Sequence, residues 1–123
     1  MTARTWASRV FGLATAAYGI SLLLRPRSLA AQLGIAEMAG EPAMRLVSAV
    51  IGVRDTADGL AIALAPKSSQ RSLALLLRAA FDAADTAACL AFLPASRQRT
   101  RVAAFAAAWS ALALAAAVAT ADR

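Results

Sequence analysis

The sequence predicts an all-α protein, a bundle of four transmembrane helices that run up, down, up and down with short loops. The hydrophobic fraction is 60% and the mean hydropathy is +0.61, whereas an ordinary globular protein contains roughly 45–50% apolar residues. The segment 102–121 has no charged residue and is as long as the ~20 residues that cross a hydrocarbon core. Proline or clustered cations separate the long apolar segments, so 1–123 is expected to form a single integral membrane domain.

The first helix is expected over 6–24 and ends at Arg25-Pro26, because a residue before proline resists the α conformation. The segment 27–35 carries apolar residues among small and polar ones. It is expected to lie in the membrane interface as a short amphipathic helix that Gly34 closes.

The second helix is expected over 43–65, after a loop at 38–41, with Pro42 suited to its first turn. The third helix is expected over 71–93, with 68–70 as its capping residues. A short basic loop then leads to the fourth helix, expected over 101–121.

Glycines recur at helical spacing in the first two long helices, as Gly12 and Gly19 and as Gly52 and Gly59. Helices in membranes associate through small residues that let the backbones approach closely. These glycines therefore predict tight packing between the helices that carry them.

The formal net charge of +6 raises the question of nucleic acid as a partner. Most cations lie at the ends of apolar segments, at Arg25, Arg27, Lys67, Arg71, Arg97, Arg99 and Arg101. Cations in such positions meet anionic lipid headgroups, and too few aromatic residues lie among them to stack bases. The expected partner is therefore the lipid bilayer and not nucleic acid, in a bacterial cytoplasmic membrane. The cations divide almost evenly between the two sides, so they do not determine the orientation.

The chain has no His and a single Cys, Cys89. An imidazole base, a His ligand for zinc or haem and an intramolecular disulfide are therefore excluded. We expect no cofactor and no metal, and any acid–base chemistry must use carboxyl groups.

Two helices carry charged residues near their middles, namely Arg54, Asp55, Asp58, Arg78, Asp82 and Asp85. A charge at the centre of a bilayer costs about 2.5–3.5 kcal/mol on insertion scales. The four carboxylates and the two guanidinium groups should therefore face one another inside the bundle. Arg45 and Tyr18 are expected to stabilise charge or bind substrate beside them, although packing explains Tyr18 equally well.

Three resemblances follow from these residues. The whole chain resembles a family of small four-span bacterial and fungal membrane proteins that is catalogued as a domain of unknown function; the features that match are Gly12, Gly19, Pro26, Arg45, Gly52-Val53-Arg54-Asp55, Gly59, Asp82 and Asp85. The motif Asp55-x-x-Asp58-Gly59 is similar to the start of the metal-binding motif of CDP-alcohol phosphotransferases, but the expected Ala-Arg is absent and the second Asp pair has a shorter spacing. The combination of Asp and Arg is similar to that of limonene-epoxide-hydrolase-type enzymes, on a different fold.

These features favour a small membrane enzyme that performs acid–base chemistry on a lipophilic small molecule. Asp55, Asp58, Asp82 and Asp85 are its predicted catalytic residues. Epoxide hydrolase, isomerase and cyclase reactions all suit a protonated carboxyl beside an ionised one.

Three alternatives stay open. One is an ion-pair network that only determines how the helices align. Another is a proton-coupled transporter or ion pathway, which in so narrow a bundle requires a homo-oligomer. The third is a non-catalytic accessory subunit of a membrane complex.

Overall fold

A computed structural model describes residues 2–121. In this range the chain forms five α-helices and one 3₁₀ turn, η1, without a β-strand, which confirms the all-α prediction for these residues. The elements are α1 (Ala3–Leu24), α2 (Ser28–Gln32), η1 (Ala36–Met38), α3 (Pro42–Leu64), α4 (Ser68–Phe92) and α5 (Arg97–Ala121).

The long helices begin earlier than the sequence predicted. α1 begins directly after Thr2, because the Oγ1 of Thr2 accepts a hydrogen bond from the backbone N of Thr5 at 3.3 Å. The predicted capping residues 68–70 form the first turn of α4, and the side chain of Gln70 accepts from the backbone N of Lys67 at 3.4 Å. Side-chain caps therefore move both helix starts outward.

The same effect lengthens α5, which begins at Arg97 and not at residue 101. The Oγ of Ser96 accepts a hydrogen bond from the backbone N of Arg99 at 3.0 Å. Helix α3 begins at Pro42 and ends at Leu64, so its predicted range of 43–65 is displaced by a residue at each end.

The connection between α1 and α3 contains less helix than predicted. Only Ser28–Gln32 is α-helical where 27–35 was expected, and Gly34 follows with a φ of 75°, a conformation that glycine adopts without strain. The 3₁₀ turn η1 overlaps the first residue of the predicted loop at 38–41, because it includes Met38. The chain thus makes two short turns before α3.

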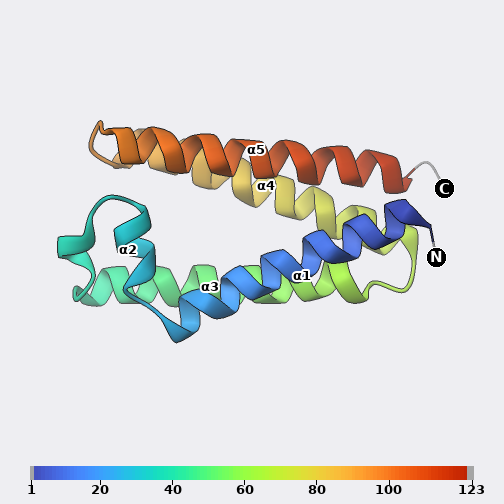
Figure 1. The fold of residues 1–123 in the computed structure, drawn as a ribbon, viewed down its shortest axis with the longest axis horizontal. Coiled ribbons are helices and arrows are strands. Elements are labelled where there is room, and N and C mark those ends of the chain that lie inside the picture. Colours follow the sequence, from blue (N-terminus) through green and yellow to red (C-terminus); the bar gives the residue numbers. More distant parts are fainter. Residues whose placement is uncertain (1, 122–123) are drawn as a thin grey trace.

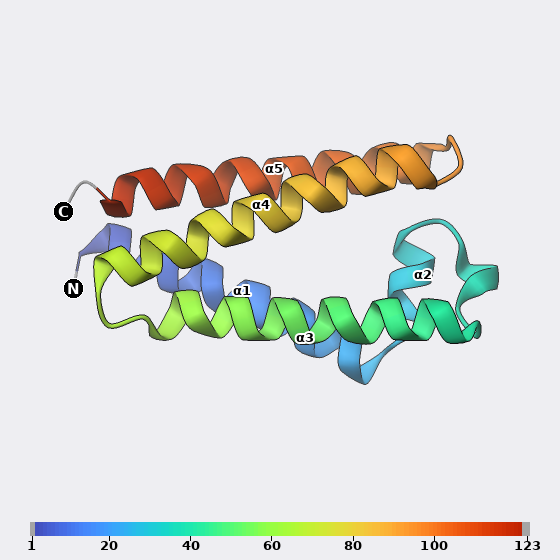
Figure 2. The ribbon, with the colours of Figure 1, turned by 180° about the vertical axis from the view of Figure 1, so that it is seen from behind.

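The four long helices form two antiparallel pairs, α1 with α3 and α4 with α5 (Figure 1). The two pairs lie closest at the end that holds both chain termini and diverge toward the other end. There α2 lies between them, as the view from behind also shows (Figure 2). The side chain of Gln98 in α5 donates a hydrogen bond to the backbone O of Gln32 at 2.9 Å, which ties α2 to the second pair.

Helices α1 and α3 touch through their backbones, which confirms the role predicted for the glycines. A Cβ on Gly59 would lie 2.3 Å from the backbone N of Ala16 and 2.5 Å from the backbone O of Gly12. A Cβ on Gly19 would lie 2.6 Å from the backbone O of Gly52. Any larger residue at these positions would force the helices apart.

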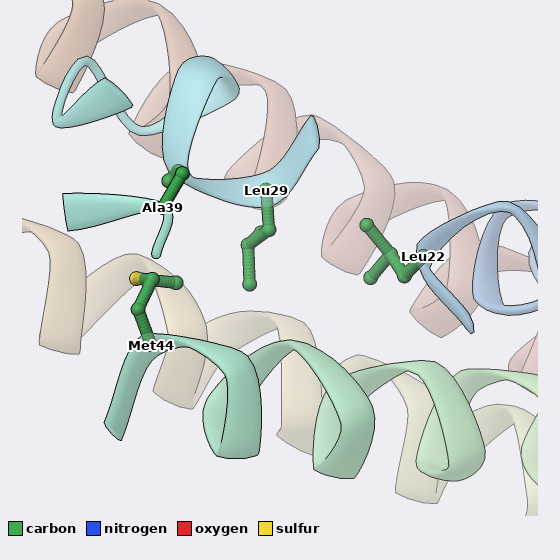
Figure 3. Close-up of a cluster of buried hydrophobic side chains, with 5 residues drawn as sticks. Leu22, Leu29, Ala39 and Met44 are labelled. Carbon is green, nitrogen blue, oxygen red and sulfur yellow. The ribbon is translucent and has the colours of Figure 1, made fainter. Parts of the chain in front are cut away.

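Two clusters of buried apolar side chains lie toward opposite ends of the molecule. One contains Leu22, Leu29, Ala30, Ala39 and Met44 and joins α1, α2 and α3 (Figure 3). The other contains Ile62, Ala74, Leu75 and Ala117 and joins α3, α4 and α5. Along α3, the charged residues lie between these two apolar clusters.

Two of the helices, α1 and α5, are long and apolar enough to cross a membrane. A signal sequence or the core helix of a soluble protein meets the same criterion, so these two helices are weak support for a membrane location. Helices α3 and α4 do not meet it, and each contains four charged residues along its length. Only two of the four predicted spans are therefore supported by length and composition among the described residues.

Candidate functional site

Arg78 of α4 lies at the centre of a buried group of carboxylates. Its Nη1 donates a hydrogen bond to Oδ1 of Asp55 on α3 at 2.7 Å. Its Nε donates to Oδ2 of Asp82 at 2.9 Å, and its Nη2 donates to the other oxygen of the same carboxylate. Arg78 and Asp82 are four residues apart in one helix, a spacing that places side chains on the same face. One planar guanidinium group thus binds two carboxylates at once.

Arg54 of α3 extends this network toward the surface. Its Nη1 and Nη2 donate to the two carboxylate oxygens of Asp85 at 3.0 and 2.7 Å, and its Nε donates to Oδ1 of Asp55 at 3.0 Å. The guanidinium carbon also lies 5.1 Å from the ring centroid of Phe81, within cation–π range. Asp55 therefore accepts hydrogen bonds from both guanidinium groups and connects them.

The network links the two helix pairs, because Arg54 and Asp55 belong to α3 whereas Arg78, Asp82 and Asp85 belong to α4. A second link is aromatic. Phe11 of α1 stacks on Trp109 of α5 with a centroid distance of 4.6 Å, and Nε1 of Trp109 donates to Oγ1 of Thr15 at 3.4 Å.

Asp58 differs from the other three carboxylates. It is 8% exposed, and its Oδ2 lies 3.9 Å from Nη1 of Arg78, beyond hydrogen-bond distance. Among residues 2–121 no donor reaches this oxygen. A buried carboxylate without a donor is costly to keep ionised, so Asp58 is the member of the cluster best placed to exchange a proton.

Exposure increases from one side of the network to the other. The side chains of Asp55, Asp82 and Arg78 are 2%, 4% and 5% exposed, whereas those of Arg54 and Asp85 are 22% and 33% exposed. The pair formed by Arg54 and Asp85 is therefore the most exposed part of the network.

Two residues assigned to the site from the sequence, Arg45 and Tyr18, make no hydrogen bond to the carboxylates in the described range. Arg45 is exposed in the first turns of α3, beside Arg25 and Arg27 at one end of the bundle, and has no contact with the carboxylates in the described range. Tyr18 is 38% exposed, and its hydroxyl donates to Oε1 of Gln32 at 2.7 Å. Arg45 lies away from the carboxylates, because the face of a helix alone does not say how far along the bundle a side chain lies. Tyr18, by contrast, lies within electrostatic range of Asp55 and Asp85.

Two arginines that were not assigned to the site have a clear structural role. Nη1 of Arg9 donates to the backbone O of Ala63 at 2.6 Å, and Nη2 of Arg71 donates to the backbone O of Ala65 at 2.8 Å. Both satisfy carbonyl groups at the C-terminus of α3, where cations are favourable. Arg71 was expected among the cations that meet lipid headgroups, and its burial at 4% exposure with its contact to Ala65 corrects that expectation.

Ser48 of α3 is a further buried polar residue on the polar side of this helix. It is 0% exposed, and among the described residues its hydroxyl has no hydrogen-bond partner. Ser48 and Asp55 are two helical turns apart on the same face of α3, about 10 Å along the axis. The spacing that places Ser48 on the face of the charged cluster can be read from the sequence, whereas its burial is known only from the structure.

The carboxylates do not form a metal site in the part of the chain that the structure describes, where no group of three or more His, Cys, Asp or Glu residues could hold a metal ion. Asp55, Asp82 and Asp85 accept hydrogen bonds from guanidinium groups instead. The metal chemistry implied by the similarity to CDP-alcohol phosphotransferases is therefore unsupported by the geometry.

Comparison with models of protein families, with curated proteins and with solved structures finds no match to this chain. The resemblances drawn from individual motifs thus stay predictions. The geometry of the charged cluster and the surface around it are the observations that bear on function.

Proposed function

We propose that α1, α3, α4 and α5 all cross a membrane, which we take to be a bacterial cytoplasmic membrane. The helices contain 22, 23, 25 and 25 residues, and ~20 are needed to cross the hydrocarbon core. The charges on α3 and α4 do not oppose this proposal, because most of them are paired with one another inside the bundle.

The distribution of side chains supports the same proposal. Each long helix exposes large apolar side chains, for example Trp6 at 58%, Leu64 at 69%, Phe92 at 87% and Phe105 at 68%. In the most apolar 18-residue stretch of each helix, only 33% of α1 and 17% of α5 is buried, whereas the core helix of a soluble protein is mostly buried. With Asp and Arg inside and large apolar residues outside, this surface suits lipid better than water.

Cysteine labelling tests the number of spans. In a Cys89→Ser background, Ser69→Cys reports on the exposed first turn of α4, next to the loop between α3 and α4, and Ala95→Cys reports on the loop between α4 and α5. If four helices cross, an impermeant maleimide added to intact cells should label one of these positions and not the other. If only α1 and α5 cross, both loops lie on the same side of the membrane and will behave alike, which would overturn the proposal.

Within this bundle the charged cluster is proposed to be the active site of an enzyme that acts on a lipophilic small molecule. The observation that carries the proposal is the buried Asp58, which no donor reaches among the described residues, beside carboxylates that are paired with Arg78. A protonated Asp58 supplies a general acid, and Asp55, one turn away on α3, supplies a base. Two carboxyl groups in different environments can divide acid and base roles in this way.

Epoxide opening illustrates the proton balance. Asp58 donates its proton to the epoxide oxygen as one C–O bond breaks. A water molecule forms the new C–O bond at that carbon and gives a proton to Asp55. Transfer of this proton from Asp55 to Asp58 restores the enzyme, and the product is a diol. Isomerisation and cyclisation use the same acid to protonate an alkene and the same base to remove a proton from the resulting cation.

The test is conversion by the purified full-length protein in detergent. The probes are limonene epoxide, epoxystearic acid and the lipid extract that copurifies with the protein, with products followed by mass spectrometry. We expect at least one probe to be converted above a detergent-only control. If neither the epoxides nor any component of the extract changes, the catalytic proposal is wrong.

A proton pathway is the second candidate, favoured by the continuity of the network. Hydrogen bonds run without a break from the half-exposed Asp85 through Arg54 and Asp55 to the buried Arg78. Vesicles that contain the protein and a trapped pH-sensitive dye test it. Proton flux without conversion of any probe would favour the pathway, and it would require a homo-oligomer to enclose the route.

A further inference from the structure

Three arginines meet at the end of the bundle where the helix pairs diverge. They border a pocket of about 420 Å³, a volume within the range of ligand sites, which is lined by Arg25, Pro26, Arg27, Ala39, Gly40 and Arg45. These residues come from the turn after α1, the turn before α3 and the first turns of α3. Three separate segments of the chain therefore bring positive charge to one concave site.

The three guanidinium groups have no carboxylate to balance them in the described range. Arg25, Arg27 and Arg45 form no ion pair and no side-chain hydrogen bond among residues 2–121, and neither Glu37 nor Glu41 in the same segment comes within 4.0 Å of them. In the charged cluster of the bundle, by contrast, each guanidinium group faces carboxylates. Like charges held together repel one another, so an anion from outside would relieve this repulsion.

The backbone around the pocket adds to its attraction for anions. The N-terminus of α3 lies at Pro42, next to Gly40, and no side chain caps it, so the positive end of the helix dipole faces this region. Gly40 leaves room beside Arg27, because a Cβ there would lie 3.6 Å from the Nη2 of Arg27. The positive charge of the arginines, the helix dipole of α3 and the open space beside Gly40 thus lie at the same pocket.

One side of the pocket adjoins the apolar core. Ala39 lines the pocket and belongs to the buried cluster with Leu29 and Met44 that Figure 3 shows. We propose that this pocket binds a phosphate group, either of a phospholipid headgroup or of a soluble phosphate ester. Arg25, Arg27 and Arg45 bind its oxygens through charge-assisted hydrogen bonds.

This site is distinct from the carboxylate cluster. Arg45 and Arg54 are nine residues apart in α3, which is about 14 Å along a helix axis. The proposal depends on neither the catalytic role of Asp58 nor the identity of its substrate, so each proposal can fail without the other.

The experiment measures binding to the full-length protein in dodecyl maltoside by isothermal titration calorimetry. The probes are dihexanoyl phosphatidic acid, dihexanoyl phosphatidylcholine and inorganic phosphate. We expect phosphatidic acid to bind, and we expect Arg27→Gln and Arg45→Gln each to weaken it about 10- to 100-fold, as loss of a hydrogen bond to a charged group does. Arg101→Gln is the matched control, because it removes the same charge from an exposed residue at the same end of the bundle.

Gly40→Leu separates a shaped pocket from general attraction to positive charge. This change leaves the net charge at +6 and fills the space beside Arg27, so it should weaken binding as well. Inorganic phosphate that competes with phosphatidic acid at the same arginines would identify a soluble phosphate ester as the ligand. Failure of inorganic phosphate to compete would identify a lipid headgroup. Equal binding of phosphatidylcholine, or equal effects of Arg101→Gln and Arg45→Gln, would overturn the proposal.

Discussion

Replacing Arg78 with Leu is expected to lower the stability of the purified protein by about 3–5 kcal/mol, the usual cost when one partner of a buried ion pair is removed. Arg78 donates hydrogen bonds to Asp55 and Asp82 and is the cation nearest to Asp58. Without it, Asp82 has no guanidinium partner in the described part of the chain. The loss should lower Tm in detergent by about 10 °C or more.

The same replacement at an exposed arginine provides the control. Arg101→Leu should change Tm little, because Arg101 is exposed in α5 and joins no ion pair of the described range. The Tm of Arg78→Lys should lie between those of Arg78→Leu and Arg101→Leu, since Lys keeps the positive charge but lacks the planar guanidinium group that binds two carboxylates. The double variant Arg78→Leu with Asp82→Leu should recover much of the loss, because well-packed apolar residues can replace a buried ion pair. Wild-type Tm in Arg78→Leu would contradict the structural role.

Replacing Asp58 with Asn is expected to lower turnover about 10²–10⁴-fold, the usual contribution of general acid–base catalysis. Asn has nearly the same size and polarity but cannot exchange a proton. The protein should still fold and insert, because among the described residues Asp58 makes no hydrogen bond that the substitution would break. Turnover of a converted probe and Tm in detergent should be measured on the same preparation.

Asp82→Asn is the matched control for this variant. It makes the same chemical change but weakens the contacts between Asp82 and Arg78, so it should lower Tm clearly. Loss of turnover with an unchanged Tm is therefore specific to Asp58→Asn. If Asp58→Asn retains full turnover, the acid role of Asp58 is wrong.

Much of the secondary structure could be predicted from local chemistry. The prediction that helices end before prolines is confirmed for α1, α3 and α4, each of which ends two residues before a proline. The predicted positions of the helix starts were less accurate, because caps such as the one that Ser96 forms depend on a single side-chain rotamer. Gly12 and Gly59 were correctly predicted to permit close packing, since a residue without a Cβ is needed wherever two backbones meet.

The sequence by itself determined that its mid-helix charges must meet. Spacing places Asp82 one turn from Arg78, and the cost of an unpaired buried charge requires partners on another helix. The tertiary structure decided how the partners are assigned, with Asp58 left without a donor in the described range. It also decided that Arg45 lies at the end of the bundle beside Arg25. Both outcomes depend on how far one helix is displaced along another, and the periodicity of a single helix carries no information about that displacement.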